Sequence, residues 1–219
     1  MNIIQTWKDG NIPYEYIPFR KSVEQNKGKW NYMFFTDSDI ELFMNNFAYE
    51  YKDVYDNFPH KIQRIDFFRY LAIYQFGGVY LDLDILLKQS LDDILKTPNV
   101  CKFPIEIDQV RDTIITRNNF HSLIGNYAFY APAKHPFIKQ IIDNIVNERI
   151  NKNDIELAQS TNGDSNEQVY VYCTTGPIMV TQSYIDYNNK SEVELIKSTP
   201  FINDSFGNYG IHCCYGSWK

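Results

Sequence analysis

Two carboxylates separated by one residue, Asp82 and Asp84, are the side chains whose spacing most directly indicates chemistry. In an extended segment, side chains two positions apart point to the same side, so both acids would face one ligand. Hard oxygen ligands of this kind suit Mg²⁺ or Mn²⁺. The apolar stretch 79–81 just before them predicts a buried strand, and open α/β sheets bind ligands beyond the carboxyl ends of their strands. Because an isolated Asp-x-Asp is common, its surroundings decide its meaning.

A helix is predicted directly before this acidic pair. Residues 60–76 carry apolar side chains at helical spacing, and Gly77-Gly78 ends the helix in a tight turn. Asp66 and Arg69 lie three positions apart on it and therefore share a face. They form either a local ion pair or part of the same site as the two acids.

Other elements are expected on both sides of this unit. We predict strands at 2–7, 30–35, 127–131 and 208–214. We predict helices at 19–27 and 177–187, together with one helix that ends at position 47 and one that begins at position 136. The polar stretch 147–168 is expected to be an exposed loop. Strands alternate with helices in the first half, which favours an α/β fold with a mostly parallel sheet flanked by helices. A length of 219 residues fits a single domain over 1–219.

Composition narrows the class of protein. Hydrophobic residues make up 44% of the chain and charged residues 22%, as in ordinary globular proteins. The net charge of −6 disfavours general binding of nucleic acid. The sequence has no apolar run long enough for a transmembrane helix and no signal-peptide core at its start. The four cysteines form no Cys-x-x-Cys pair, which argues against structural zinc, and a cytoplasmic location is the expectation.

Several motifs in order resemble one enzyme family. The strings Arg64-Ile65-Asp66-Phe67-Phe68-Arg69-Tyr70 and Gly77-Gly78-Val79-Tyr80-Leu81-Asp82-Leu83-Asp84 resemble the family-32 glycosyltransferases, the Asp-x-Asp sugar-transferase group. That group includes yeast Golgi mannosyltransferases and many bacterial capsule and lipopolysaccharide enzymes, and the clostridial glucosylating toxins share a similar central motif. Further matches are Ile3-Ile4-Gln5-Thr6-Trp7-Lys8, without the histidine that usually precedes the glutamine, Phe35-Thr36-Asp37, Gly176-Pro177 and His212 to Trp218.

This resemblance implies a GT-A type nucleotide-sugar-binding fold, a divalent cation (Mn²⁺ or Mg²⁺) and transfer with retention of anomeric configuration. It implies that Asp82 contacts the ribose and donor sugar beside the metal, and that Asp84 binds the metal directly. His212 matches a third metal ligand. Ser217 and Trp218 match an element that touches the metal and the diphosphate.

The resemblance also implies positions for the rest of the donor. Asp66 and Arg69 would lie against the donor sugar or ribose. Gln5, Thr6 and Trp7 end the first strand, where such enzymes hold the nucleotide base, although Trp7 could equally close the core. Asn126 would contact the donor sugar or simply form a turn.

The reaction implied is transfer of a hexose from a nucleotide-diphosphate sugar to a hydroxyl of a glycan, lipid-linked or protein acceptor. A UDP-hexose donor is favoured, with GDP-mannose second. Acceptor contacts would come from the second half of the chain, including 151–168. The chain is either a whole small enzyme or one domain of a longer one.

Two other functions stay open at this point. One is a non-catalytic module that binds nucleotide sugars or glycans on the same fold. The other is a haloacid-dehalogenase-like phosphatase, which also uses Asp-x-Asp after a strand. That class places the pair near the N-terminus with a small polar residue behind it, whereas Ile85-Leu86-Leu87 follows here.

Overall fold

The computed structural model describes residues 1–110, 113–116, 119–197 and 205–216. Its strands are β1 Asn2–Thr6, β2 Asn31–Phe35, β3 Gly78–Leu81, β4 Ile85–Leu87, β5 Cys101–Ile107, β6 Leu123–Ile124, β7 Ala128–Ala131, β8 Val193–Ile196, β9 Ser205–Phe206 and β10 Gly210–His212. Its α-helices are α1 Ile17–Asn26, α2 Asp37–Phe47, α3 Lys52–Asn57, α4 Lys61–Phe76, α5 Thr113–Thr116, α6 Pro136–Val146, α7 Lys152–Thr161, α8 Asn166–Thr174 and α9 Pro177–Asp186.

Seven strands form the main sheet, in the order β2-β1-β3-β7-β5-β6, with β8 paired to β5. β2, β1 and β3 are parallel, β7 is antiparallel to both β3 and β5, β6 is antiparallel to β5, and β8 is parallel to β5. Among the described strands of the main sheet, only β6 and β7 therefore run against the common direction. The predicted mostly parallel sheet is confirmed. A second sheet of three strands, in the order β4-β10-β9, lies beside it.

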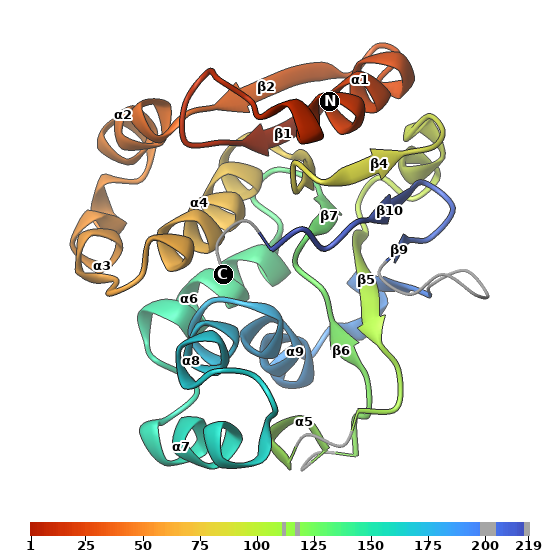
Figure 1. Ribbon diagram of the computed structural model, residues 1–219. Helices are drawn as coiled ribbons and strands as arrows, with labels where there is room; N and C mark the ends of the chain where they lie inside the picture. The colour runs from red at the N-terminus through yellow and green to blue at the C-terminus, as the bar shows by residue number, and fades with distance from the viewer. Residues whose placement is uncertain (111–112, 117–118, 198–204, 217–219) are drawn as a thin grey trace.

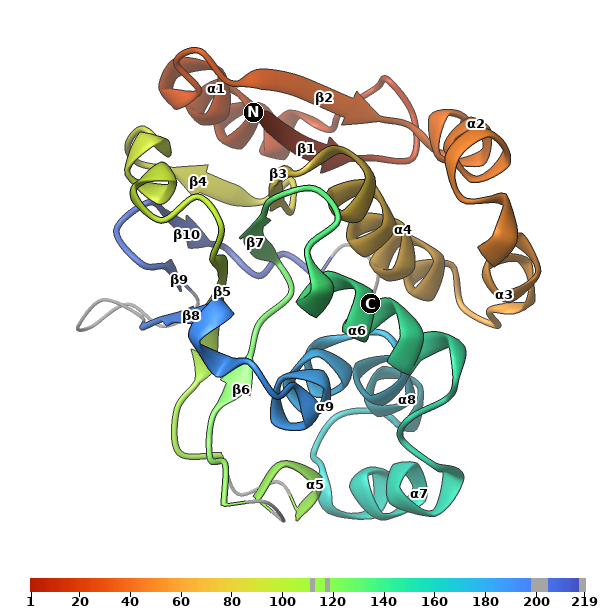
Figure 2. The same cartoon turned by 180° about the vertical axis from the view of Figure 1, so that it is seen from behind.

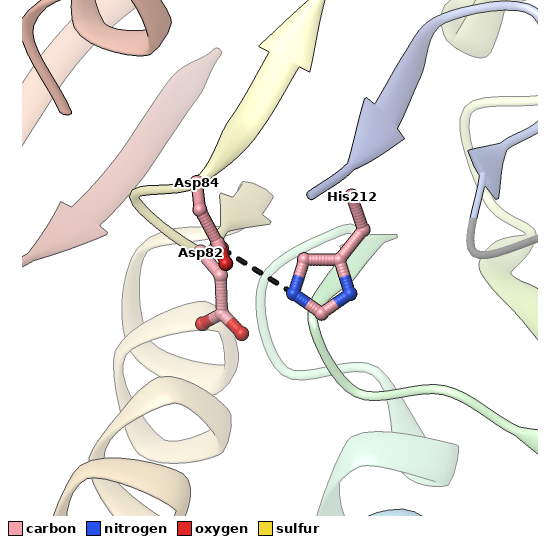
Figure 3. A group of neighbouring side chains, drawn as sticks. All are labelled: Asp82, Asp84 and His212. Carbon is pink, nitrogen blue, oxygen red and sulfur yellow. Dashed lines mark ion pairs between the residues drawn. The ribbon is translucent and has the colours of Figure 1, made fainter. Parts of the chain in front are cut away.

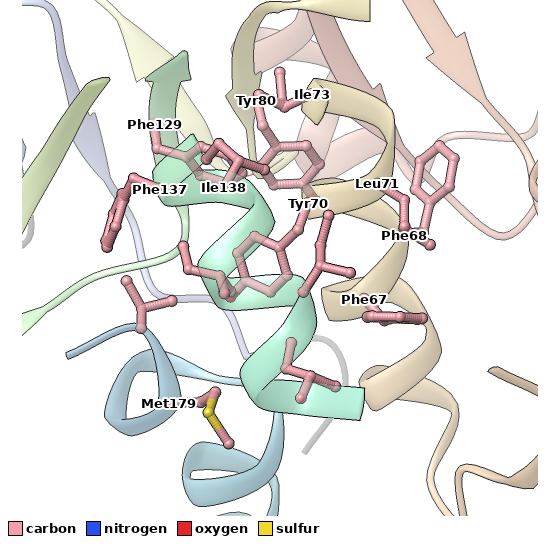
Figure 4. Close-up of a cluster of buried hydrophobic side chains, with 14 of the residues drawn as sticks. Phe67, Phe68, Tyr70, Leu71, Ile73, Tyr80, Phe129, Phe137, Ile138 and Met179 are labelled. Atoms are coloured by element: carbon pink, nitrogen blue, oxygen red, sulfur yellow. The ribbon is translucent and has the colours of Figure 1, made fainter. Parts of the chain in front are cut away.

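Alternation along the strands separates the core into layers, because successive strand side chains point to opposite faces. Ile3 of β1 packs in the cluster under α1 and β4, whereas the adjacent Ile4 packs against α2 and α4, and both are fully buried. Figures 1 and 2 show α1 beside β4, with β10 on the far side of β4, and α6, α8 and α9 gathered below α4. The face toward α4 and α6 is aromatic: the rings of Phe103 and Phe129 stack at 4.8 Å, and Tyr80 lies next to Phe129 (Figure 4).

The expected loop at 147–168 is wrong, because two helices occupy most of it. α7 begins after Asn151 and α8 after Ser165, and each cap side chain accepts a hydrogen bond from a backbone N–H in the first turn. In α7 only Ile155 and Ala158 are buried, so the apolar spacing is too sparse to show a helix. In the sequence, the N-cap residues, rather than an apolar stripe, were the features that indicated these two helices.

The turn between α4 and β3 depends on glycine. Gly78 has a φ of +120°, and a Cβ atom there would lie 2.1 Å from the backbone oxygen of Asn2 in the neighbouring strand β1. Gly77 ends the helix with a φ of +64°. Because Gly78 carries no side chain, β3 can approach β1 closely and bring the Asp pair to the sheet's carboxyl edge.

We therefore expect Gly78→Ala to lower the free energy of unfolding by at least about 1–3 kcal/mol, the usual cost of a strained backbone position. Urea unfolding measures the loss. Gly163→Ala is the matched control, because a Cβ there meets no atom within 4 Å. Equal stability of the two variants would contradict the proposed close approach.

Candidate active site

Asp82, Asp84 and His212 are brought together by two sheets. The acids lie on the short link between β3 and β4, and β4 pairs antiparallel with β10 so that Ile85 is opposite His212. Figure 3 shows the imidazole pointing from the end of β10 toward both carboxylates. One ligand atom from each of the three residues lies within 4.8 Å of the others. Asp84 and His212 thus lie next to each other although they are 128 positions apart in the sequence.

Asp84 is held by the segment that follows β10. His212 Nε2 lies 3.3 Å from Asp84 Oδ1, and the backbone N–H of Tyr215 donates to Oδ2 at 2.8 Å. The N–H of Cys213 donates to the backbone oxygen of Asp84 at 3.1 Å. Burial opposes ionisation of Asp84, but His212 and the backbone N–H groups of Tyr215 and of Asp84 itself outweigh it and hold the pKa of Asp84 below its usual value. Burial likewise disfavours the imidazolium of His212, yet the bond to Asp84 raises the pKa of His212 to about 11.

Asp82 is anchored through one oxygen. Tyr80 donates its hydroxyl to Asp82 Oδ1 at 2.8 Å, and Arg69 Nη1 lies 3.3 Å from the same oxygen. Burial raises the pKa of Asp82, although Arg69 opposes the shift. Within the described part of the chain no hydrogen bond is recorded to Asp82 Oδ2. The anchored Oδ1 thus orients the carboxylate while Oδ2 stays available to a ligand.

Behind the acids, Asp66 and Arg69 form the centre of a buried network. Arg69 Nη2 is 3.0 Å from Asp66 Oδ1, and Arg69 Nη1 donates to the backbone oxygen of Asn126 at 2.8 Å. Asp66 accepts further hydrogen bonds from Asn126 Nδ2 and from Thr175 Oγ1. Burial raises the pKa of Asp66 to about 6, with Arg69 acting against it. Arg69 is only 3% exposed and fixes Asp82 in place, while it also lines the cleft, so its contact with the donor stays a prediction.

The three candidate metal ligands open into a cleft of about 770 Å³, within the size range of small-molecule sites. One end is lined by the end of β1 and the acids; the other by α4, α8 and the β5–β6 pair. The described lining includes Thr6, Trp7, Lys8, Tyr16, Asp66, Arg69, Asp82, Asp84, Glu106, Ile107, Val110, Asn126, Tyr127, Asp164, Tyr172, His212 and Cys214. The N-terminal β–α unit and the C-terminal half therefore share one cavity.

The residues at the end of β1 differ in position. Thr6 and Trp7 line the cleft, and the Trp7 ring lies 4.9 Å from that of Tyr16 at its mouth. Gln5 does not reach the cleft: it is fully buried and donates from Nε2 to the backbone oxygen of Asp82 at 3.2 Å. In this structure Gln5 supports the Asp pair from within the core, and its expected contact with the nucleotide stays a prediction.

Some residues of the site were not singled out from sequence. Tyr80 precedes Asp82 by two positions on a strand, so the alternation that pairs the acids could have identified it. Thr175, Tyr127 and Cys214 arrive from distant segments and carry no local signal. Asn126, in contrast, was singled out, and it lines the cleft beside Asp66. Ser217 and Trp218 lie outside the described residues.

The donor set fits a divalent cation of the Mg²⁺ or Mn²⁺ kind. It combines two carboxylates and one imidazole, and the open oxygen of Asp82 lies on the same cleft as His212. Asp84 and His212 already approach each other closely. A bound cation would replace this direct contact, with each side chain binding the cation instead.

The fold and the cleft define the class of protein. The structure superposes on a solved chain described as PaToxG Glycosyltransferase with a TM-score of 0.50 and 16% identity, over 84% of this chain and 67% of that one. The chain thus has the GT-A fold of a glycosyltransferase, with the acidic pair at the carboxyl edge of the sheet.

Sequence comparison points to one family. Residues 1–101 match the family model described as the glycosyltransferase sugar-binding region containing a DXD motif. Asp82-Leu83-Asp84 is the DXD tripeptide in the matched part of the chain. These comparisons support a glycosyltransferase and give no support to the phosphatase interpretation.

Two curated relatives extend the similarity. Inositol phosphoceramide mannosyltransferase 1 of Schizosaccharomyces pombe is 32% identical over 146 residues, which are 65% of this chain and 41% of the relative. Initiation-specific alpha-1,6-mannosyltransferase of Candida albicans is 25% identical over 86% of this chain and 53% of its own length. The chain thus spans about half the length of these relatives or less. Among the described helices, none has the length and apolar character needed to cross a membrane.

Proposed function

We propose that this chain is a metal-dependent glycosyltransferase that moves a hexose from a nucleotide-diphosphate sugar to a hydroxyl acceptor with retention of configuration. The observation that carries the proposal is the meeting of Asp82, Asp84 and His212 at the edge of the cleft. The match of residues 1–101 to the DXD-containing family model supports the same reaction. We also propose that residues 1–219 form one domain, since one core cluster runs from Ile4 to Val193.

In this proposal Asp84 and His212 hold the cation directly and Asp82 completes the set through Oδ2. When bound, the cation would neutralise charge on the nucleoside diphosphate that leaves, which is Lewis-acid catalysis. The protein's part is positioning. Tyr80 and Arg69 orient Asp82, and the rigid ladder between β4 and β10 sets the place of His212.

The two ends of the cleft support a division between donor and acceptor. Thr6, Trp7 and Tyr16 offer a hydroxyl and aromatic faces near the acids, a suitable surface for a base and ribose. The acceptor would enter at the end formed by α8 and the β5–β6 pair, where Glu106 and Tyr172 line the wall. This end includes Asp164, from the stretch expected to contact the acceptor.

The identity of the donor is a more specific part of the proposal. UDP-hexose and GDP-mannose are the two donors we put forward. The names of the curated relatives describe mannosyl transfer, which gives GDP-mannose more weight than the sequence motifs alone. For the acceptor we propose a glycan, lipid-linked or protein hydroxyl.

Binding of nucleotide with metal tests the proposal. We expect UDP or GDP with Mn²⁺ to raise the thermal midpoint, with about 2.7 kcal/mol of stabilisation at a ligand concentration of 100 times Kd. The same nucleotide without metal should give a smaller shift. CMP is the control nucleotide in a thermal-shift series. If no nucleotide stabilises the protein with Mn²⁺ or Mg²⁺, the transferase proposal fails.

A donor-hydrolysis assay then separates an enzyme from a binding module. Slow release of nucleoside diphosphate from UDP-glucose, UDP-galactose or GDP-mannose in the presence of Mn²⁺ would support catalysis. Metal-dependent nucleotide binding without hydrolysis or transfer to any hydroxyl acceptor would favour the non-catalytic module.

A further inference from the structure

The short segment after β10 wraps around the candidate metal ligands. Within it, Cys214 adopts a left-handed backbone conformation with a φ of +53°, unusual for a residue with a side chain. This turn carries the chain from Cys213 to Tyr215, whose backbone N–H groups both donate to Asp84. The same turn directs the side chain of Cys214 back toward His212 and into the cleft.

The thiol of Cys214 contacts the imidazole on the side away from Asp84. Its Sγ lies 3.4 Å from His212 Nδ1 and 3.8 Å from the backbone oxygen of His212. One arrangement of protons satisfies both contacts: Nδ1–H donates to sulfur, and S–H donates to the carbonyl oxygen. Nε2, which is 3.3 Å from Asp84 Oδ1, would then offer its lone pair to a cation that displaces the proton between these two atoms.

Stacking alone does not select this orientation. The ring of Tyr127 lies 4.3 Å from that of His212 at an interplanar angle of 18° and fixes the plane of the imidazole. A half-turn about the Cβ–Cγ bond keeps that plane but moves both nitrogens away from their partners. In the flipped ring, carbon atoms would replace Nε2 beside Asp84 and Nδ1 beside Cys214. On the side of the imidazole away from Asp84, the contact with sulfur is therefore what distinguishes the two ring orientations.

We propose that Cys214 is a positioning residue that holds His212 with Nε2 directed at the metal site. Partners of this kind orient ligating histidines, and their removal commonly weakens metal affinity by about 10–100-fold. A thiol is an unusual choice for this role, because sulfur accepts hydrogen bonds weakly. The inference rests on the proposed metal-dependent function, and it adds a residue to which neither the family resemblance nor the acidic motif assigns a role.

Mn²⁺ affinity of the full chain tests this role without any assay of turnover. Titration with MnCl₂ alone, followed by the paramagnetic resonance signal of free Mn²⁺, should show Cys214→Ala binding about 10–100-fold more weakly than the parent protein. Cys214→Ser keeps a hydrogen-bonding atom on a shorter bond, so its affinity should fall between the two. Cys101→Ala is the matched control, because that thiol is buried on β5 and lies outside the described cleft lining.

The possible outcomes distinguish failure of the positioning role of Cys214 from failure of the proposed metal-dependent function. If the parent protein binds no Mn²⁺, the proposed metal site and this inference both fail. If the parent binds Mn²⁺ and Cys214→Ala binds equally well, only the positioning role is overturned. Co²⁺ provides the last distinction: an intense thiolate-to-cobalt absorption band that Cys214→Ser removes would make Cys214 a ligand, which also overturns the positioning role. Circular dichroism verifies that each variant is folded.

Discussion

Asp84→Asn should reduce metal-dependent donor hydrolysis by about a thousandfold or more while the protein stays folded, because the cation contributes several kcal/mol to such a reaction. Asp84 is the residue on which the proposed site converges, with His212 on one carboxylate oxygen and the N–H of Tyr215 on the other. Asparagine keeps the shape and one accepting oxygen, so the turn around it can persist. What it removes is the negative charge that a divalent cation requires.

Three measurements check this expectation: kcat/KM for hydrolysis with Mn²⁺, the Kd for Mn²⁺, and the thermal midpoint. Asp93→Asn is the matched control, since Asp93 is an exposed acid paired only with Lys96 at 2.9 Å and lies outside the cleft lining. Asp93→Asn should match the parent protein in all three. Unchanged hydrolysis by Asp84→Asn would remove Asp84 from the proposed metal site.

Arg69→Ala should cost about 3–5 kcal/mol of unfolding free energy, the usual result of removing one partner from a buried charge cluster. Arg69 touches Asp66, Asp82 and the backbone oxygen of Asn126. Without it Asp66 and Asp82 lie close together and both have lost their ion pair with the guanidinium. Urea unfolding measures the loss, and Arg149→Ala, which removes a half-exposed pair with Asp186, should cost no more than about 1 kcal/mol.

The loss should also depend on pH, with a definite sign. Burial already raises the pKa of Asp66 to about 6, and Arg69 limits that rise. In Arg69→Ala the pKa should rise further, so the folded variant binds a proton that the unfolded chain, with an ordinary aspartate, has released. The stability of the variant should therefore fall as pH increases from 5 to 8, more steeply than that of the parent.

A second substitution isolates the cause. Asp66→Asn in the Arg69→Ala background removes the unpaired acid, so it should recover part of the lost stability at pH 8 and little at pH 5. A penalty for Arg69→Ala that is the same at both pH values would show that lost packing, rather than unpaired charge, governs the effect.

Local sequence was sufficient for much of the fold. The helix at 60–76 and the strand at 79–81 are confirmed within a residue at each end. Both are governed by short-range rules: apolar side chains at helical spacing, a double glycine that ends the helix, and alternation along a strand. Where the signal was a cap rather than a stripe, as at Asn151 before α7, the helix was missed.

The same local rules placed Asp66 and Arg69 on one helical face, where they form an ion pair. They also predicted that Asp82 and Asp84 share a face by alternation along a strand, whereas the structure holds the two acids together in a turn between β3 and β4. They could not show that Arg69 bridges these two sets or that Gln5 supports Asp82 from within the core. Such contacts depend on how deeply each side chain is buried, and burial depends on what packs against it from elsewhere in the chain.

The distant partners were decided by tertiary structure alone. His212 meets Asp84 because β10 pairs with β4, and the register of that pairing depends on the whole second sheet. Cys214 reaches the imidazole only because the chain turns left-handed after β10. A motif of adjacent residues is set by backbone geometry over a few ångströms, whereas a site assembled from separate strands exists only once the core has formed around it.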